Sequence, residues 1–199
     1  MPFGSSQWMY SSGFYPTEID QSLRFDGTSY LSRTPSVAGN RKTWTMSMWF
    51  KRGNIGSTNF LFDTRAAVNA TQLTACYINS SNFLVFGNGA NDFRLTTQVF
   101  RDVSAWYHLV VVFDSTQATA LDRIKIYING EQITSFSATN NPSLNTDYGW
   151  NQTSAHHIGS TAIPGAFWDG YLADTYFVDG TALDPTSFGE FKSGVWIPK

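Results

Sequence analysis

Residues Trp106–Asp114 read WYHLVVVFD, and residues Arg123–Thr134 read RIKIYINGEQIT. The first stretch is a short apolar run between polar flanks, which is typical of a strand buried on both faces. In the second stretch three isoleucines alternate with other side chains, which predicts a half-buried strand. Asn129-Gly130 then supplies the positive φ angles of a tight two-residue hairpin. Together these features predict an all-β fold, an antiparallel sandwich of two sheets.

Strand patterns continue along the rest of the chain. Leu23 and Phe25, followed by Tyr30 and Leu31 after an Asp26-Gly27 turn, predict an opening hairpin. Residues 137–154 are polar and predict one long loop. Further strands are expected at residues 44–51, 59–63, 73–78, 83–86, 93–96, 157–159 and 167–178.

One short C-terminal helix is expected near Thr186–Phe191. Asp184 is a suitable N-cap residue, and Pro185 is suited to the first helical position. The chain contains no long amphipathic pattern, so no other helix is predicted.

The composition argues against several classes of function. The chain has 199 residues, a formal net charge of −2 and no cluster of lysine or arginine, so binding to nucleic acid through phosphates is not expected. No apolar run approaches the roughly 18 residues that span a bilayer, so we expect no membrane insertion. Residues 1–15 lack the basic start and apolar run of a secretory signal.

Cys76 is the single cysteine, so the chain cannot form an internal disulfide. This absence indicates synthesis in a reducing compartment, with stability supplied by the core. The thiol lies in an alternating run, which predicts a small buried residue rather than a reactive one.

Residues 1–20 differ from the remainder and are expected to form an extended N-terminal arm, followed by one domain over residues 21–199. The arm mixes glycine, serine and proline with large apolar side chains, which a solvated linker would not carry. We expect it to dock on a partner, with folding back onto its own sandwich as the alternative. The docking residues would be Phe3, Trp8, Met9, Tyr10, Phe14 and Tyr15.

Several segments, taken in order, resemble the laminin G-like or concanavalin A-like jelly-roll family over roughly residues 22–191. The resemblance implies a two-sheet jelly roll. The segments are residues 23–31 (LRFDGTSYL), 44–51 (WTMSMWFK), 106–114 (WYHLVVVFD), 126–130 (IYING), 158–159 (IG) and 168–174 (WDGYLAD).

The end of the chain narrows this resemblance. Residues 177–185 (FVDGTALDP) and 194–199 (GVWIPK) are similar to the lectin-like domains of tailed-bacteriophage structural proteins. This similarity implies a component of the virion that is made in the bacterial host cytoplasm. The single cysteine agrees with this, because the cytoplasm is reducing and proteins made there rarely form disulfides.

The concanavalin A-like fold also houses glucanases, so catalysis must be considered. Such enzymes resemble one another in a Glu-x-Asp-x-x-Glu strand, whose carboxylates attack the sugar and donate a proton. The chain has three glutamates, and Glu18-Ile19-Asp20 begins this pattern without its third acid. We therefore predict no catalytic residues and no enzyme activity.

Histidine and acidic residues likewise predict no metal site and no cofactor. His108 lies in a predicted core strand, and His156 and His157 are adjacent, so a strand would point them to opposite faces. Calcium is the metal that the resemblance implies. If it binds, Asp169 and Asp174 are the candidate ligands, although such residues at strand ends are more often turn residues.

A carbohydrate site is predicted on the polar loop and beside it. Tyr148 and Trp150 would be exposed rings for stacking on a sugar, and Asn145 and Asn151 would bind hydroxyl groups. Trp168 is a further candidate. Packing of these rings in the core or at its rim is the alternative.

Two functions follow from the sequence. The first is a non-catalytic bacteriophage virion surface protein, a capsid decoration or a short fibre or spike component, which docks on other virion proteins of the capsid or tail. We expect it to be a homo-oligomer, and the symmetry of virions suggests a trimer. The alternative is a carbohydrate-binding tail adhesin that contacts a glycan of the host envelope. The two functions can hold together.

Overall fold

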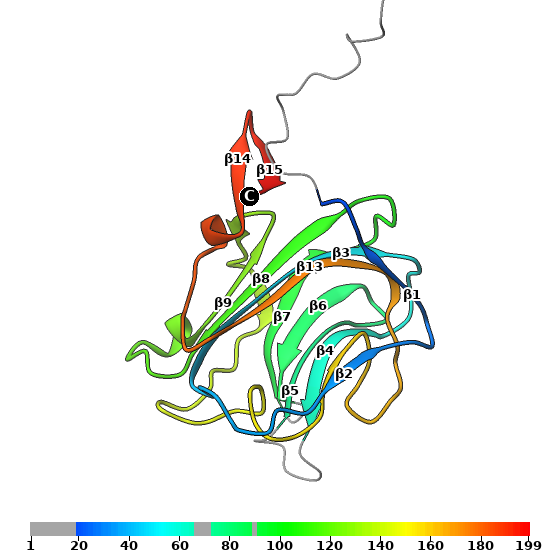
Figure 1. Cartoon of the computed structure of the whole chain (residues 1–199). Coiled ribbons are helices and arrows are strands. Elements are labelled where there is room, and N and C mark those ends of the chain that lie inside the picture. The colour runs from blue at the N-terminus through cyan, green and yellow to red at the C-terminus, as the bar shows by residue number, and fades with distance from the viewer. Residues whose placement is uncertain (1–18, 66–72, 89–90) are drawn as a thin grey trace, which may run out of the picture.

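The computed structural model describes residues 19–65, 73–88 and 91–199. They form two antiparallel sheets packed face to face and a separate C-terminal hairpin (Figure 1). The predicted jelly-roll sandwich is therefore confirmed. The six residues of the predicted docking arm lie outside the described residues.

The first sheet has the strand order β1-β13-β3-β8-β9-β10, and every neighbouring pair is antiparallel. Its centre is β3 paired with β8, the apolar run that predicted a fully buried strand. The strands are β1 (Leu23–Asp26), β3 (Thr43–Arg52), β8 (Tyr107–Asp114), β9 (Ile124–Ile128), β10 (Glu131–Gln132) and β13 (Asp169–Asp179).

The second sheet has the order β11-β7-β6-β5-β4-β12-β2 and is antiparallel throughout. Six of its strands match the expected positions within a few residues, whereas β11 was not expected and takes up the start of the predicted loop at residues 137–154. They are β2 (Leu31–Arg33), β4 (Asn59–Arg65), β5 (Leu73–Ile78), β6 (Phe83–Gly87), β7 (Asp92–Val99), β11 (Phe136–Ala138) and β12 (His156–Ile158).

The predicted opening hairpin is wrong, because β1 and β2 belong to different sheets. Asp26 and Gly27 do form a turn, and Gly27 has a φ of 81°. However, the Gly27 amide donates to the carbonyl oxygen of Trp168 (3.1 Å), and the chain crosses from the first sheet to the second. A turn signal in the sequence does not determine whether the strands on either side of it pair with each other.

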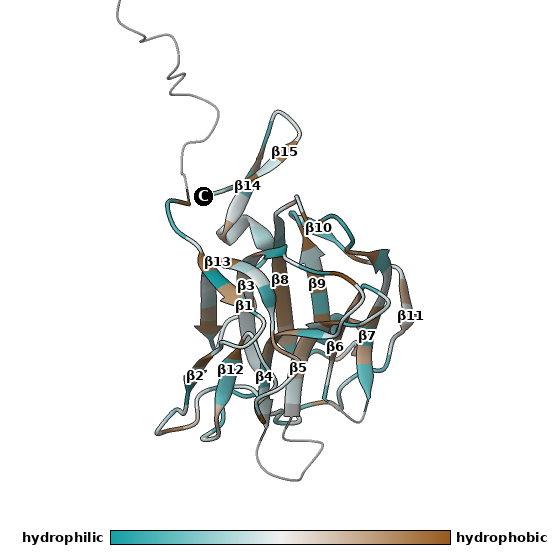
Figure 2. Cartoon of the chain, turned by 90° about the vertical axis from the view of Figure 1, so that its right-hand side faces the viewer, coloured by the Kyte–Doolittle hydropathy of each residue, from teal (hydrophilic) through white to brown (hydrophobic). Residues whose placement is uncertain are grey.

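The core lies between the two sheets and is rich in aromatic rings. On β3, the expected strand at residues 44–51, the side chains of Trp44, Met46, Met48 and Phe50 point inward and are almost completely buried. Cys76 is also buried, as expected. Brown, apolar residues concentrate on central strands such as β5 and β8 (Figure 2). Burial of this apolar area is the main force that holds the sheets together.

Two buried arginines tie the long loop to the sandwich. Arg94 donates to five oxygens, among them the carbonyl of Asn140 (2.9 Å). Arg123, at the end of the single-turn helix η3 (Ala120–Arg123), donates to the carbonyl of Pro142 (2.8 Å). Hydrogen bonds from a charged group to otherwise buried carbonyls are among the stronger ones in proteins. The loop after β11 is therefore fixed across the end of the core.

The predicted C-terminal helix is correct in its start and wrong in its length. Asp184 caps the helix η4 (Pro185–Ser187) by accepting from the Thr186 amide at 2.8 Å. The helix then stops, because the chain enters an unpredicted hairpin of β14 (Gly189–Lys192) and β15 (Val195–Pro198). Among the described residues, no helix has the length and apolar character needed to cross a lipid bilayer.

Candidate functional site

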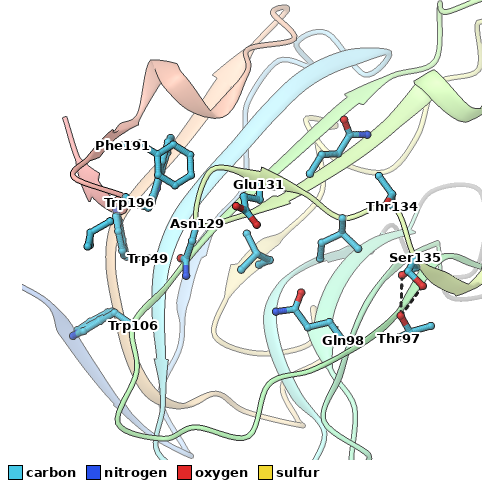
Figure 3. A pocket seen from close by; sticks show the side chains of 15 residues that line it. Trp49, Thr97, Gln98, Trp106, Asn129, Glu131, Thr134, Ser135, Phe191 and Trp196 are labelled. Carbon is cyan, nitrogen blue, oxygen red and sulfur yellow. Dashed lines mark hydrogen bonds between the residues drawn. The ribbon is translucent and has the colours of Figure 1, made fainter.

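A groove of about 680 Å³ opens where the C-terminal hairpin meets the β9–β10 turn (Figure 3). Segments distant in sequence form it: β3, the end of β7, the loop before β8, the region from β9 to β11, and the β14–β15 hairpin. The fifteen lining residues are Trp49, Thr97, Gln98, Trp106, Ile128, Asn129, Glu131, Gln132, Ile133, Thr134, Ser135, Phe191, Gly194, Val195 and Trp196.

Aromatic side chains gather at one end of the groove (Figure 3). Trp106 is 37% exposed and Phe191 is 53% exposed, so both rings are accessible to a ligand. Trp49 and Trp196 lie deeper and are both 8% exposed. Phe191 packs edge-on against Trp196 with a centroid distance of 4.9 Å, which fixes its ring.

Polar side chains and a few aliphatic ones line the rest of the groove. Gln98, Glu131 and Gln132 are exposed, and within the described residues their side chains make no hydrogen bond or ion pair. Thr97 and Ser135 bond to each other through their hydroxyl groups at 2.8 Å. The groove therefore offers amide and carboxylate groups that are uncommitted within the described structure.

Asn129 is held in place by the tight turn that the sequence predicted. Asn129 and Gly130 have φ angles of 50° and 81°, the left-handed region that a two-residue hairpin requires. The Asn129 side-chain oxygen accepts from the His108 amide at 2.8 Å. The amide NH₂ group of Asn129 is then the donor that it can offer to a ligand.

Trp196 is the structural support of the aromatic end. Its indole N–H donates to Nδ1 of His108 at 2.9 Å, and the two rings are stacked. Two glycines leave room for the indole, because a Cβ atom at Gly130 or Gly189 would overlap the Trp196 ring. The hairpin is thereby seated on the outer face of the first sheet, where Ala173 and Trp49 complete a small apolar cluster.

His108 is neutral in this arrangement. Because an indole only donates, Nδ1 of His108 must accept and the ring proton must lie on Nε2. Nε2 then donates to the Ser47 hydroxyl at 2.8 Å. Burial of the imidazole lowers the pKa of His108 to about 4. His108 is thus a structural residue, as its position in a core strand predicted.

Comparison with known proteins identifies the family. A family model described as the concanavalin A-like lectin/glucanases superfamily matches residues 25–186. The chain belongs to this family. Among curated proteins, none matches it.

Solved structures with the concanavalin A-like fold are similar to the chain. Domain 4 of AbnA, a GH43 extracellular arabinanase from Geobacillus stearothermophilus, in complex with arabinotriose, is 20% identical, with a TM-score of 0.59 over 85% of this chain and 75% of that one. The CBM40 of Ruminococcus gnavus IT-sialidase, bound to α2,3 sialyllactose, is 10% identical, with a TM-score of 0.57 over 84% and 94%. A native heptameric SAP-like pentraxin from Limulus polyphemus is 17% identical, with a TM-score of 0.54 over 78% and 74%. These likenesses establish the fold.

The predicted stacking rings of this concanavalin A-like domain are buried, so the expectation that they are exposed is wrong. Trp168 is fully buried, and Tyr148 and Trp150 are 6% and 4% exposed. Trp150 packs edge-on against Phe62, and the Tyr148 hydroxyl accepts from the Ser143 amide at 3.2 Å. The loop that carries two of them closes the end of the core, so the rings serve packing.

Of the two predicted asparagines, Asn151 shares a groove with Trp150, whereas Asn145 does not line it. Asn145 is exposed, with a φ of 56° in a turn. Asn151 donates through its amide group to Asp179 (2.7 Å) and to the carbonyl of Asn40 (3.1 Å). The groove that Asn151 and Trp150 share is a second one, of about 610 Å³, and residues of β2 and β13 also line it.

The two calcium candidates do not converge on one site. Asp169 forms an ion pair with Arg24 at 2.6 Å. Asp174 lies at a bulge of β13, with a φ of 43°, five residues further along the strand. At about 3.3 Å per residue, the Cα atoms of the two residues are separated by roughly 16 Å along the strand. Within the described residues, no group of three histidine, cysteine or acidic side chains could hold a metal ion.

The sequence reasoning missed the groove. Trp106 and Glu131 stood in the stretches that decided the fold, but nothing local indicated that they share a surface with Phe191. One signal was available, because Ser193-Gly194 is a turn dipeptide, and both residues adopt positive φ angles (50° and 80°).

Proposed function

We propose that this concanavalin A-like domain is a non-catalytic carbohydrate-binding module whose ligand lies in the groove beneath the C-terminal hairpin. The observation that carries the proposal is the combination of two accessible rings, Trp106 and Phe191, with uncommitted polar side chains beside them. The apolar faces of sugar rings stack on aromatic side chains, and sugar hydroxyls bond to amides and carboxylates. The groove volume lies within the usual range of ligand sites.

The number of acidic residues that line the groove supports a non-catalytic role. Glycoside hydrolysis ordinarily needs two carboxyl groups, about 5–10 Å apart, on either side of the scissile bond. Of the fifteen lining residues, all within the described part of the chain, Glu131 is the single acid. The groove therefore has the parts of a binding site and lacks the usual pair for hydrolysis.

A glycan array followed by calorimetry tests the proposal. We expect millimolar or tighter binding to at least one glycan, and a loss of about tenfold or more in affinity for Trp106→Ala and for Phe191→Ala. Tyr30→Ala is the matched control, because this ring is 39% exposed and lies outside the groove. Binding that survives both groove substitutions, or no ligand at millimolar concentration, would refute the proposal.

We further infer that the module is carried on a tailed-bacteriophage virion, as a capsid decoration or a short fibre or spike component. The similarity of residues 177–185 and 194–199 to phage structural proteins supports this location, as does the aromatic arm at residues 1–20. In this setting the groove would contact a host-envelope glycan, and the arm would dock on other virion proteins. Several copies, a trimer in the simplest case, would multiply a weak sugar contact.

Imaging of the particle tests the location directly. Deletion of residues 1–16 should abolish incorporation into virions while glycan binding by the isolated domain is retained. Normal occupancy of the truncated protein would exclude the docking role of the arm. Absence of the protein from purified particles would exclude the virion proposal and leave the carbohydrate proposal intact.

A further inference from the structure

We infer that the groove accepts neutral oligosaccharides and rejects sugars that carry carboxylate or sulfate groups. This inference rests on the proposed carbohydrate-binding function and adds the class of ligand. The feature that carries it is the charge of the lining. The fifteen lining residues include one carboxylate, Glu131, and neither lysine nor arginine.

Glu131 lies between the aromatic end and the polar end of the groove, beside Asn129 (Figure 3). Its side chain is exposed and, within the described residues, unpaired by any cation. A carboxylate accepts hydrogen bonds and donates none, so it suits the hydroxyl donors of a neutral sugar. An acidic sugar in the same place would set two negative charges side by side, which is unfavourable.

Lys51, Arg24 and Lys192 lie near the groove but are not among its lining residues. Arg24 lies beyond Trp106, over the ring of Tyr171 with its guanidinium 5.4 Å from the centroid, and Tyr171 in turn packs beside Trp106. The guanidinium is already paired with Asp169 at 2.6 Å. Lys192 follows Phe191 on β14, and neighbouring side chains of a strand point to opposite faces.

The neutral groups of the groove complete the argument. Gln98 and Gln132 can each donate and accept, and the Asn129 amide donates. These groups match the mixed donor and acceptor character of sugar hydroxyls and give no preference for an anion. A groove built for acidic glycans would be expected to carry arginine or lysine, because charge-assisted bonds to carboxylate and sulfate are the strong ones.

Calorimetry with a matched pair of ligands tests the inference. The neutral glycan identified on the array is compared with its counterpart in which one hexose is a uronic acid, at low and at high salt. We expect the acidic form to bind about tenfold more weakly at low salt, with a smaller difference at high salt because screening weakens the repulsion. The variant Glu131→Gln should reduce the ratio between the two ligands to about threefold or less.

Glu190→Gln is the matched control, because the same substitution on β14 lies outside the lining and should leave the ratio unchanged. An array that yields acidic glycans as the ligands, or a ratio that Glu131→Gln does not alter, would overturn the inference while leaving the carbohydrate function standing. Failure to bind any glycan, neutral or acidic, would remove the proposed function and this inference with it.

Discussion

The indole N–H of Trp196 bonds to Nδ1 of His108 across 2.9 Å and thereby joins the C-terminal hairpin to the buried strand β8. The bond exists only while His108 is neutral, since a protonated imidazole has no free acceptor. Trp196 also forms the deep wall of the groove, so the protonation state of one buried residue bears on both the stability of the domain and the shape of the site.

Stability should therefore depend on pH through His108. Burial lowers the pKa of His108 to about 4, from an ordinary value of 6.5. Between these values the unfolded chain binds a proton that the folded chain does not, so the free energy of unfolding falls as the pH is lowered from about 6.5 toward 4. We expect a loss of about 2–3 kcal/mol between pH 7.5 and 4.5, measured by urea denaturation.

The variant His108→Gln separates this effect from others. Glutamine does not titrate, so the loss of stability over the same interval should shrink by most of that amount. His156, whose pKa burial also lowers, remains in both proteins and contributes equally to each. Equal pH slopes for the variant and the parent would show that His108 is not the titrating group.

Gly130→Ala should be strongly destabilising. Gly130 has a φ of 81°, which is unfavourable for alanine, and the added Cβ would overlap the Trp196 ring. We expect a cost of about 2–4 kcal/mol, the sum of backbone strain and overpacking, measured by urea denaturation. Gly194→Ala is the control, because its φ is 80° and a Cβ there would meet nothing within 4 Å. Equal costs for the two substitutions would mean that the contact with Trp196 contributes nothing.

The thiol of Cys76 should be unreactive in the folded protein. It is fully buried, and this burial raises the pKa of the thiol, so little thiolate forms at neutral pH. Ellman's reagent should label one thiol per chain rapidly in urea and almost none in native buffer. Rapid labelling in native buffer would show that the core opens on the time scale of the assay.

Calcium should not change the melting temperature. Asp169 is neutralised by Arg24, and Asp174 lies too far along β13 to share an ion with it. Thermal melts in millimolar calcium and in chelator should therefore coincide. A higher Tm in calcium that chelator reverses would contradict this expectation.

The strands were predictable from the sequence because the residues that a sandwich buries follow a short periodic pattern within each strand. Trp44 and Phe50 alternate with other side chains on β3, and the Asn129-Gly130 turn needs only its own two residues. The site was less predictable. Trp106 and Phe191, about 85 positions apart in the sequence, line one groove only when the hairpin folds onto the outer face of the first sheet.

The misplaced rings have a related physical reason. The sequence around Tyr148 and Trp150 is rich in asparagine, serine and threonine, which is typical of an exposed loop. The path of that loop is set by distant partners, because Arg94 and Arg123 bind its carbonyl groups. The rings are then directed into the end of the core. The sequence of the loop alone does not indicate this burial.

The hairpin that closes the groove lies after residue 186, where the match to the family ends. The part of the chain that builds the fold and the part that supplies this wall are thus separate in sequence. The other residues of the hairpin could be exchanged, with Trp196 kept as the anchor and Gly189 kept to leave room for its ring. Evolution or an engineer could in this way alter what such a domain recognises without rebuilding its interior.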